Sequence, residues 1–249
     1  MQSQLVFQEK KERERLRVQN KLLSQAEKPA LEYFFKGKSE LSVLDIGCND
    51  GNRTFQRFSD KRVSRVIGLE YNRELVEKAH RQYGNSKFFF YQMDVESQSF
   101  SKDLQNLVDA SAGGQFDLIC LSFVLMHLLD GKKLLRILEQ FLKKDGVLFI
   151  TESNDYASTL VPDEKNLLEQ FLDILNQDKY AGRRDTGAKV SGWLADCGYG
   201  HIHVWCQGIS AGKEELERKN QIFQTFFSYL PEDLEILLGE EPDSRDYQE

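Results

Sequence analysis

The 249-residue sequence has no C-x-x-C pair, and its four cysteines stand apart at positions 48, 120, 197 and 206. It also begins with a Gln-rich, charged stretch that lacks the apolar run of a secretory signal. Isolated cysteines without a secretory signal favour reduced intracellular thiols over a disulfide framework. We therefore expect a cytoplasmic protein.

Long apolar runs are missing as well. The longest, Cys120 to Leu129, is about half the ~20 residues that span a bilayer, and Ser122 and His127 interrupt it. Basic residues are in deficit, with 33 Lys and Arg against 40 Asp and Glu, a net charge of −7 and a pI near 5.3. This negative net charge argues against a protein whose main task is to bind the phosphate backbone of a nucleic acid. It does not exclude a local basic patch.

The pattern of apolar residues predicts strands and helices in alternation. Strands are expected at 43–46, 65–69, 87–91, 116–121 and 147–152, and helices at 8–35, 52–59, 72–82, 100–114 and 131–143. Such alternation indicates βαβ units joined by right-handed crossovers. We predict an α/β fold with a Rossmann-like, doubly wound, mostly parallel sheet, an N-terminal helical lid and C-terminal helical additions.

Three regions are expected along the chain. Residues 1–36 would form the lid, residues 37–210 the core with an insert at about 153–187, and residues 211–249 a helical and acidic extension. Pro29 is expected to kink or restart the first helix. Further helices are expected at 163–176, 188–197 and 213–229, and a sixth strand at 201–206 with no convincing seventh after it.

The first strand leads into a turn that contains Gly47 and Gly51, with Asp45 just upstream. Glycine is required where a backbone approaches a nucleoside cofactor closely. The spacing is not the phosphate-binding G-x-G-x-x-G, because Asn49 takes the place of the second glycine and Asp50 would repel a phosphate. An acidic glycine loop suits a ligand with an ammonium group, which points to S-adenosylmethionine.

Acidic residues also follow the next two strands, at the edge where open α/β sheets bind ligands. Glu70 could accept hydrogen bonds from both hydroxyls of a ribose, whereas the alternative is a solvated surface glutamate. Asp94 could accept from an adenine amino group while the N–H of Val95 meets a ring nitrogen. The alternative for Asp94 is a loop residue that caps a helix.

These motifs resemble the class I S-adenosylmethionine-dependent methyltransferases over residues 43–152. The motifs in order are Asp45-Ile46-Gly47-Cys48-Asn49-Asp50-Gly51, Glu70, Asp94, Phe116-Asp117-Leu118-Ile119 and Lys144-Asp145-Gly146-Val147-Leu148. The resemblance implies that Gly47 and Gly51 line the methionine part, Glu70 the ribose, and Asp94 with Val95 the adenine. Asp45, Cys48, Tyr71 and Ser122 are also assigned to the cofactor site, although packing is the alternative for Cys48. Asn49 departs from the common G-C-G-x-G loop, and since Asn tolerates unusual backbone angles we expect binding with an altered loop.

A second resemblance covers Glu12–Gln19, Asp178–Arg184 and Leu194–Tyr199, which are similar to segments of the ubiquinone-biosynthesis-like, small-molecule methyltransferases. Gln19 shares with Glu12 and Arg15 the helix stripe expected to face the protein, so these side chains need polar partners. The cofactor carboxylate or the substrate could supply those partners. Ion pairs with the body of the protein are the alternative.

His127 and Tyr156 are the candidate general bases. In family members with this pattern the residue at 127 lies near the cofactor, and an imidazole could orient the substrate or take its proton. A packing histidine is the alternative. Asn154, Asp155 and Tyr156 follow the fifth strand and could touch the acceptor, or form an ordinary loop. His201 and His203 share one strand face, but no third ligand is evident, so we expect no metal.

We thus predict an enzyme that transfers a methyl group from S-adenosylmethionine to a small organic acceptor and releases S-adenosylhomocysteine. One alternative is a methyltransferase of RNA or protein, with a docking surface at Lys10, Lys11, Arg13, Arg15 and Arg17. Another is a non-catalytic module that only binds the cofactor. The sequence leaves the acceptor and a homodimer open.

Overall fold

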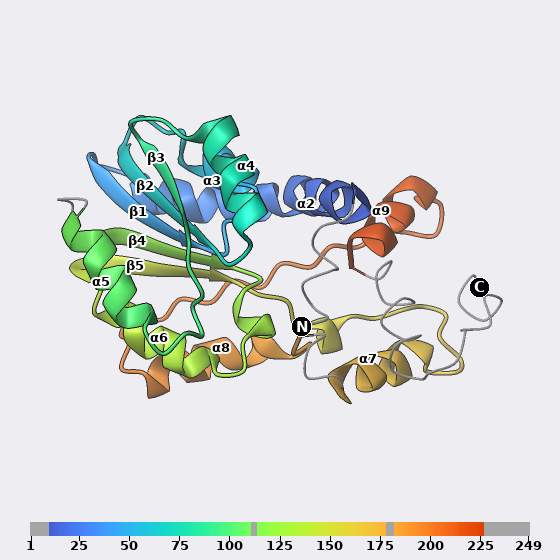
Figure 1. Ribbon diagram of the computed structural model, residues 1–249. Helices are drawn as coiled ribbons and strands as arrows, with labels where there is room; N and C mark the ends of the chain where they lie inside the picture. Colours follow the sequence, from blue (N-terminus) through green and yellow to red (C-terminus); the bar gives the residue numbers. More distant parts are fainter. Residues whose placement is uncertain (1–9, 111–113, 178–181, 227–249) are drawn as a thin grey trace. The chain divides into compact units, whose positions relative to one another are not determined.

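The computed structural model describes residues 10–110, 114–177 and 182–226 (Figure 1). The chain divides into two compact units. The first comprises residues 1–34, 156–183 and 204–249, and the second comprises residues 35–155 and 184–203. No helix in the described ranges combines the length and the apolar character needed to cross a membrane.

The second unit contains a five-stranded sheet in the order β3-β2-β1-β4-β5, in which every neighbouring pair is parallel. The strands are β1 (Leu41–Ile46), β2 (Val63–Glu70), β3 (Phe88–Gln92), β4 (Phe116–Ser122) and β5 (Leu142–Thr151). The order reverses between β1 and β4, which is where open α/β sheets place their ligands. The predicted doubly wound parallel sheet is confirmed.

Helices cover both faces of this sheet (Figure 1). On one face lie α3 (Asn52–Phe58) and α4 (Arg73–Tyr83), and on the other lie α5 (Phe100–Ala110), α6 (Gly131–Glu139) and α8 (Thr186–Asp196). Side chains alternate along β1, so Leu44 and Ile46 join the α5 and α6 face while Asp45 points to α3. The same alternation on β3 places Phe88 against Phe55 of α3, with ring centroids 5.2 Å apart.

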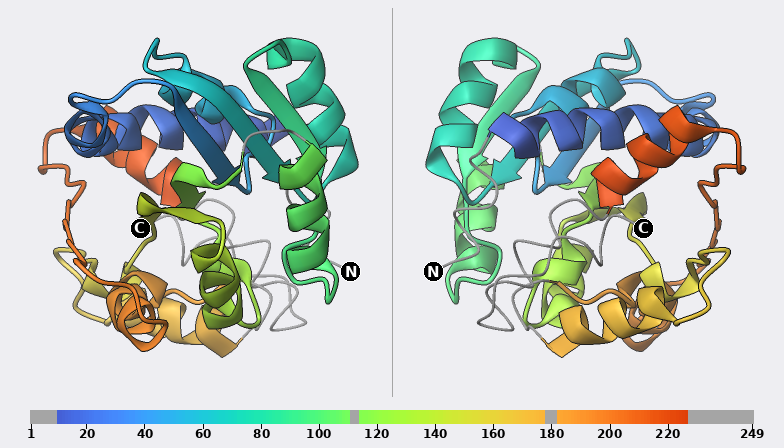
Figure 2. Two further views of the ribbon diagram at one scale, coloured as in Figure 1. Left: turned by 90° about the vertical axis from the view of Figure 1, so that its left-hand side faces the viewer. Right: turned by 90° about the vertical axis from the view of Figure 1, so that its right-hand side faces the viewer.

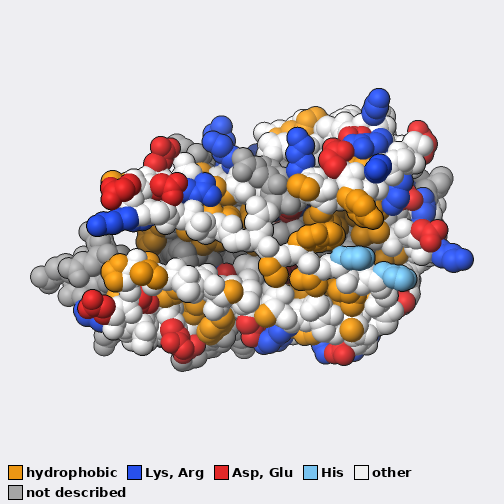
Figure 3. All heavy atoms as spheres, turned by 180° about the vertical axis from the view of Figure 1, so that it is seen from behind, with side chains coloured by type: hydrophobic (Ala, Val, Ile, Leu, Met, Phe, Trp, Pro, Cys, Tyr) orange, Lys and Arg blue, Asp and Glu red, His pale blue; other side chains and the backbone are white. Residues whose placement is uncertain are grey.

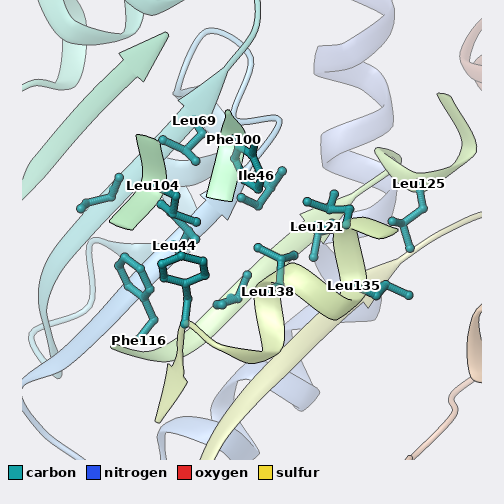
Figure 4. Packing of buried hydrophobic residues seen from close by; sticks show 14 of the residues in the cluster. Leu44, Ile46, Leu69, Phe100, Leu104, Phe116, Leu121, Leu125, Leu135 and Leu138 are labelled. Atoms are coloured by element: carbon teal, nitrogen blue, oxygen red, sulfur yellow. The ribbon is translucent and has the colours of Figure 1, made fainter. Parts of the chain in front are cut away.

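The core of the second unit is a dense cluster of aliphatic and aromatic side chains (Figure 4). Leu44 and Ile46 of β1, Leu69 of β2 and Leu121 of β4 pack there against residues of α5 and α6. The helix residues labelled in the figure are Phe100, Leu104, Leu135 and Leu138, all of them buried. Removing this apolar surface from water is the main force that fixes the sheet between its helices.

Side-chain caps define where two of the helices begin. Asn72 accepts hydrogen bonds from the N–H groups of Glu74 and Leu75 at the start of α4. Asp130 caps α6 by accepting from the N–H of Lys133. Each cap satisfies amide groups that the helix cannot pair internally.

Three sequence-based expectations need correction. Residues 201–206 do not form a sixth strand, because His201 has a left-handed φ of 54° that breaks an extended run. Pro29 lies inside α2 (Lys10–Phe35), so the helix does not restart there, and a kink at this residue stays a prediction. The strand expected at 147–152 begins earlier, at Leu142, and residues 144–146 fall where its pairing with β4 shifts register.

The first unit is largely helical. Its described elements are α2 up to residue 34, α7 (Leu167–Gln177), α9 (Leu216–Phe226) and most of the 3-10 helix η2 (Asp155–Ala157). Helices α2 and α9 lie side by side in every view (Figures 1 and 2). A hydrogen bond of 2.7 Å from Arg15 Nη1 to the carbonyl of Thr225 joins them. The helices predicted at 8–35, 163–176 and 213–229 thus have counterparts within the described residues.

Candidate active site

The turn between β1 and α3, here called the glycine loop (residues 47–51), has an unusual backbone. Gly47, Asn49 and Gly51 have φ values of 70°, 51° and 76°, all in the left-handed region. The N–H groups of Gly47 and Cys48 both donate to the carbonyl of Leu69, at 2.8 and 3.0 Å. Asn49 thus adopts the unusual angles that its side-chain type tolerates, and the loop folds back against the end of β2.

The two glycines are needed for packing as well as for backbone angles. A Cβ at Gly47 would lie 2.6 Å from Cγ2 of Val124, and one at Gly51 would lie 2.9 Å from Cβ of Ala79. The turn after β4 and helix α4 therefore fill the space that a side chain would take. This packing requirement adds to the two reasons that the sequence suggested for these glycines, the approach of a cofactor and an ordinary strand-to-helix turn.

The acidic residues around the loop are engaged by protein groups. Asp45 is buried and accepts a hydrogen bond of 2.5 Å from Thr54 Oγ1 on α3. Asp50 forms an ion pair of 2.6 Å with Lys78 on α4 and accepts from the N–H of Asn52. The negative charge of Asp50, which we expected to face a ligand, is therefore balanced by Lys78.

Glu70 connects the end of β2 to the glycine loop. Its Oε2 accepts from the N–H of Asn49 and its Oε1 accepts from the N–H of Asn72, each at 3.0 Å. Burial raises the pKa of this carboxyl above its ordinary value, and the N–H groups of Asn72, Asn49 and Tyr71 oppose that shift. Each carboxylate oxygen can accept more than one hydrogen bond, so both retain capacity for a diol.

A hollow of about 290 Å³ lies at the carboxyl ends of β2 and β3, and its lining begins at Tyr71, the residue after Glu70. It is lined by Tyr71, Gln92, Met93, Asp94, Ser97 and Asp103. The Asp94 carboxylate is exposed and accepts the N–H of Glu96 at 2.9 Å, within a turn that precedes α5, so it does not cap that helix. Val95 packs partly against the hydrophobic core.

A turn with a left-handed residue follows β4. Ser122 accepts a hydrogen bond of 3.0 Å from Arg57 of α3, and Phe123 has a φ of 55°. The N–H of Phe123 donates to the carbonyl of Thr151 on β5, which ties the turn to the neighbouring strand. The turn then forms the 3-10 helix η1 (Leu125–His127), on which the His127 side chain is exposed.

Glu152, the residue that follows β5, was not predicted from the sequence. Its Oε1 accepts from the N–H groups of Val124 and Leu125, at 2.9 and 2.7 Å. Burial raises its pKa to about 7, against the effect of those N–H groups. The available signal was an acidic residue directly after a hydrophobic strand, a position close to the one that Glu70 occupies at the end of β2.

The segment after Glu152 remains in the second unit up to Asp155. Asn154 is exposed, whereas Asp155 lies 3.5 Å from Arg184 and donates its N–H to the carbonyl of that arginine. Burial raises the pKa of Asp155, while Arg184 lowers it. No group of three His, Cys, Asp or Glu residues in the described ranges is placed to hold a metal ion.

The structure brings most of the predicted site residues to the carboxyl edge of one sheet. These are Asp45, Gly47, Cys48, Gly51, Glu70, Tyr71, Asp94, Val95, Ser122 and His127. Cys48 is buried, with its Sγ 2.9 Å from where a Cβ of Gly68 would lie, which shows that it packs. Gln19 on α2 and Tyr156 belong to the first unit, where Tyr156 Oη donates to Asp173 at 3.0 Å. Their roles stay predictions, and the side chain of Glu12 lies outside the described residues.

Known proteins with similar sequences are methyltransferases. Juvenile hormone acid O-methyltransferase of Bombyx mori is 23% identical over 184 residues, which cover 70% of this chain and 62% of that protein. The uncharacterized methyltransferase YcgJ of Bacillus subtilis strain 168 is 29% identical over 143 residues, 56% of this chain and 49% of that protein. The chain thus spans less than two thirds of the length of either relative.

Structural comparison agrees with the observed fold. The plantazolicin methyltransferase BpumL, in complex with S-adenosylhomocysteine, superimposes with a TM-score of 0.53 at 17% identity, covering 79% of this chain and 73% of that one. The sequence itself matches the family described as methyltransferase domain over residues 17–248. The chain therefore belongs to the methyltransferase domain family.

Proposed function

We propose that this enzyme transfers the methyl group of S-adenosylmethionine to a small organic acceptor, with the cofactor held at the carboxyl ends of β1, β2 and β3. The observation that carries the proposal is Glu70, which braces the glycine loop through Asn49 and directly precedes Tyr71, which lines the hollow together with Asp94. In this arrangement the Glu70 carboxylate would lie between two parts of the cofactor site. The glycine loop would hold the amino-acid part of the cofactor, and the hollow would hold the nucleoside.

The residues present fit such a cofactor. Glu70 retains lone pairs for a ribose diol, and the exposed Asp94 retains acceptor capacity for an adenine amino group. Gly47 and Gly51 adopt left-handed backbone angles that let the glycine loop turn at the carboxyl end of β1, the edge where open α/β sheets bind ligands. When bound, the cofactor supplies an already activated sulfonium methyl group.

The chain's own part in the reaction is to align the acceptor and to hold or remove a proton. Alignment of two reactants can contribute up to about 7–11 kcal/mol to the lowering of a barrier. If the acceptor atom is a hydroxyl or an amine, His127 at the end of η1 is the first candidate to take its proton, and Tyr156 is the second. A carboxylate acceptor would need no base.

A small acceptor is favoured over RNA by the charge of the chain. The net charge is −7, and the face drawn in Figure 3 shows Lys and Arg side chains among Asp and Glu rather than as a continuous basic surface. The named substrate of the Bombyx mori relative is a small organic acid, which supports the same class of acceptor. Residues 1–36 would act as a lid on this site.

Calorimetry with S-adenosylhomocysteine tests the cofactor site. We expect Glu70→Ala and Asp45→Ala to abolish or greatly weaken binding, because each removes a carboxylate that organises the loop. Glu74→Gln, which changes an exposed glutamate on α4, serves as the matched control and should bind as the natural chain does. Unchanged affinity in both alanine variants would remove the site assignment.

Transfer of radiolabelled methyl groups tests the acceptor class. Purified enzyme is offered labelled S-adenosylmethionine with a cell extract that has been separated into small molecules, RNA and protein. Label in the small-molecule fraction supports the proposal, whereas label in RNA or protein contradicts it. Strong tRNA binding that falls steeply with salt would favour the RNA alternative. Cofactor binding without label in any fraction would favour the non-catalytic alternative.

A further inference from the structure

Glu152 holds the backbone of the turn that follows β4. Both hydrogen bonds to Oε1 come from consecutive amides, those of Val124 and Leu125. Two neighbouring N–H groups that converge on one oxygen form a small anion-binding nest, and a carboxylate is the ligand that such a nest prefers.

The second oxygen of the same carboxylate has no comparable role. Oε2 of Glu152 is fully buried and makes no hydrogen bond of ordinary geometry among the described residues, although the N–H of Met126 also lowers the pKa of this carboxyl group. Buried polar atoms of folded proteins nearly always have a partner, and an acceptor without one costs free energy. A carboxyl group kept in this position therefore points to a task other than stabilising the fold.

The turn after β4, which Glu152 holds, contacts the glycine loop. The same turn carries His127, the candidate base. Val124 fills the space beside Gly47, where a Cβ would come within 2.6 Å of its Cγ2. The carbonyl of Val124 accepts the N–H of His127 at 3.0 Å. A shift of the Val124 backbone would therefore move both the contact with the glycine loop and the position of His127.

Asp155 is the charged group that acts on Glu152, and Arg184 and His127 are the further titratable groups on the adjoining elements. Asp155, in the segment after β5, disfavours the ionised form of Glu152, and Arg184 before α8 lies 3.5 Å from Asp155. His127 ends η1, the element that Glu152 holds. Burial raises the pKa of Glu152 to about 7, so the group changes charge close to neutral pH.

We propose that Glu152 is a positioning residue whose ionised carboxylate fixes the turn 123–127 against the glycine loop, and that protonation loosens this turn and weakens cofactor binding. Charge-assisted hydrogen bonds are about twice as strong as neutral ones, so the amides of Val124 and Leu125 are held less firmly by a neutral carboxyl. The inference rests on the cofactor placement proposed above.

The first test follows the amides themselves. In ¹⁵N NMR spectra of the natural chain, the amide resonances of Val124 and Leu125 should shift with a midpoint near pH 7. Glu152→Gln, which imitates the protonated side chain, should remove that transition. Glu139→Gln, a matched change of an exposed residue on α6, should retain it. Amides that do not titrate in the natural chain would overturn the inference without any reference to the cofactor.

The second test measures the affinity for S-adenosylhomocysteine by calorimetry at about pH 6 and about pH 8, on either side of neutrality. The natural chain should bind at least about fivefold more weakly at the lower pH, the size of a modest coupling between two sites. Glu152→Gln should bind equally weakly at both values. His127→Gln should keep the pH dependence, which separates the carboxyl from the imidazole.

The outcomes distinguish this inference from the proposed function. A pH dependence that persists in Glu152→Gln, or is lost in His127→Gln, would overturn the positioning role while leaving the cofactor site intact. Failure of the natural chain to bind S-adenosylhomocysteine at either pH would overturn the proposed cofactor site, and the amide titration would still decide whether Glu152 controls the turn.

Discussion

Thr54 Oγ1 donates a hydrogen bond of 2.5 Å to the buried carboxylate of Asp45. The bond joins the first turn of α3 to the last residues of β1, and the glycine loop is the connection between them. Asp45 and Thr54 thus fix the two ends of the segment that we propose holds the amino-acid part of the cofactor.

We expect Thr54→Val, which is close to isosteric, to destabilise the fold by about 1.5–3 kcal/mol, since it removes a hydrogen bond to a charged group. Urea unfolding gives the change in the free energy of unfolding. Thr54→Ser keeps the hydroxyl and should retain most of the stability. A valine variant as stable as the natural chain would show that the bond contributes little.

Gly47→Ala should destabilise the protein and weaken cofactor binding. The variant places a Cβ 2.6 Å from Val124 at a φ of 70°, where a side chain is strained by about 1–3 kcal/mol in addition to the clash. Adding Val124→Ala should remove the clash and recover part of the stability. Gly192→Ala, inside α8 with open space around it, should instead stabilise by about 0.5–1 kcal/mol. Thermal unfolding of these variants and the natural chain measures the differences.

Stability should fall as the pH rises through neutrality because of Glu152. Its pKa in the folded protein is about 7, above the ordinary value of 4.5, so the folded state holds the proton more tightly. The proton on Glu152 therefore contributes to the free energy of unfolding. The contribution is complete below the ordinary pKa and is lost as the pH rises through about 7, a change of about 3 kcal/mol in total.

Glu152→Gln should therefore be more stable than the natural chain at alkaline pH, with a difference that shrinks in acid. Melting temperatures measured across this range give the comparison, and Glu139→Gln is again the control. A Gln variant that is less stable at every pH would mean that the ionised carboxylate stabilises the fold, which is the opposite of the effect expected from its raised pKa.

Removing residues 1–28 should leave a folded second unit with impaired turnover. Residues 35–155 and 184–203 form that unit and hold its sheet and core, so circular dichroism should show retained structure. Turnover with the acceptor fraction identified above is the second measurement. A truncated chain with full activity would reject the lid proposal.

Local patterns were enough to predict most of the second unit. The short apolar runs that became β1 to β4, together with the helical segments between them, predicted the parallel sheet. Acidic residues at strand ends indicated Glu70 and Asp94. The expected strand at 201–206 was wrong because alternating residues do not reveal the left-handed backbone at His201.

What the sequence did not reveal are pairings between distant residues. Lys78 lies 28 positions after Asp50, and Val124 lies 28 positions before Glu152. No local pattern indicates that these groups meet, because the fold alone brings α4 to the glycine loop and β5 to the turn after β4. The charge of Asp50 was misjudged, and the role of Glu152 was missed, for this reason.

The distribution of the four thiols has a practical consequence. Cys48, Cys120 and Cys197 are buried, whereas Cys206 is exposed. Burial and nearby carboxylates raise the pKa of Cys48 well above its ordinary value, so this thiol is protonated and shielded from alkylating reagents. A maleimide dye should therefore attach to the folded natural chain at Cys206 alone, providing a single fluorescent reporter without any engineered cysteine.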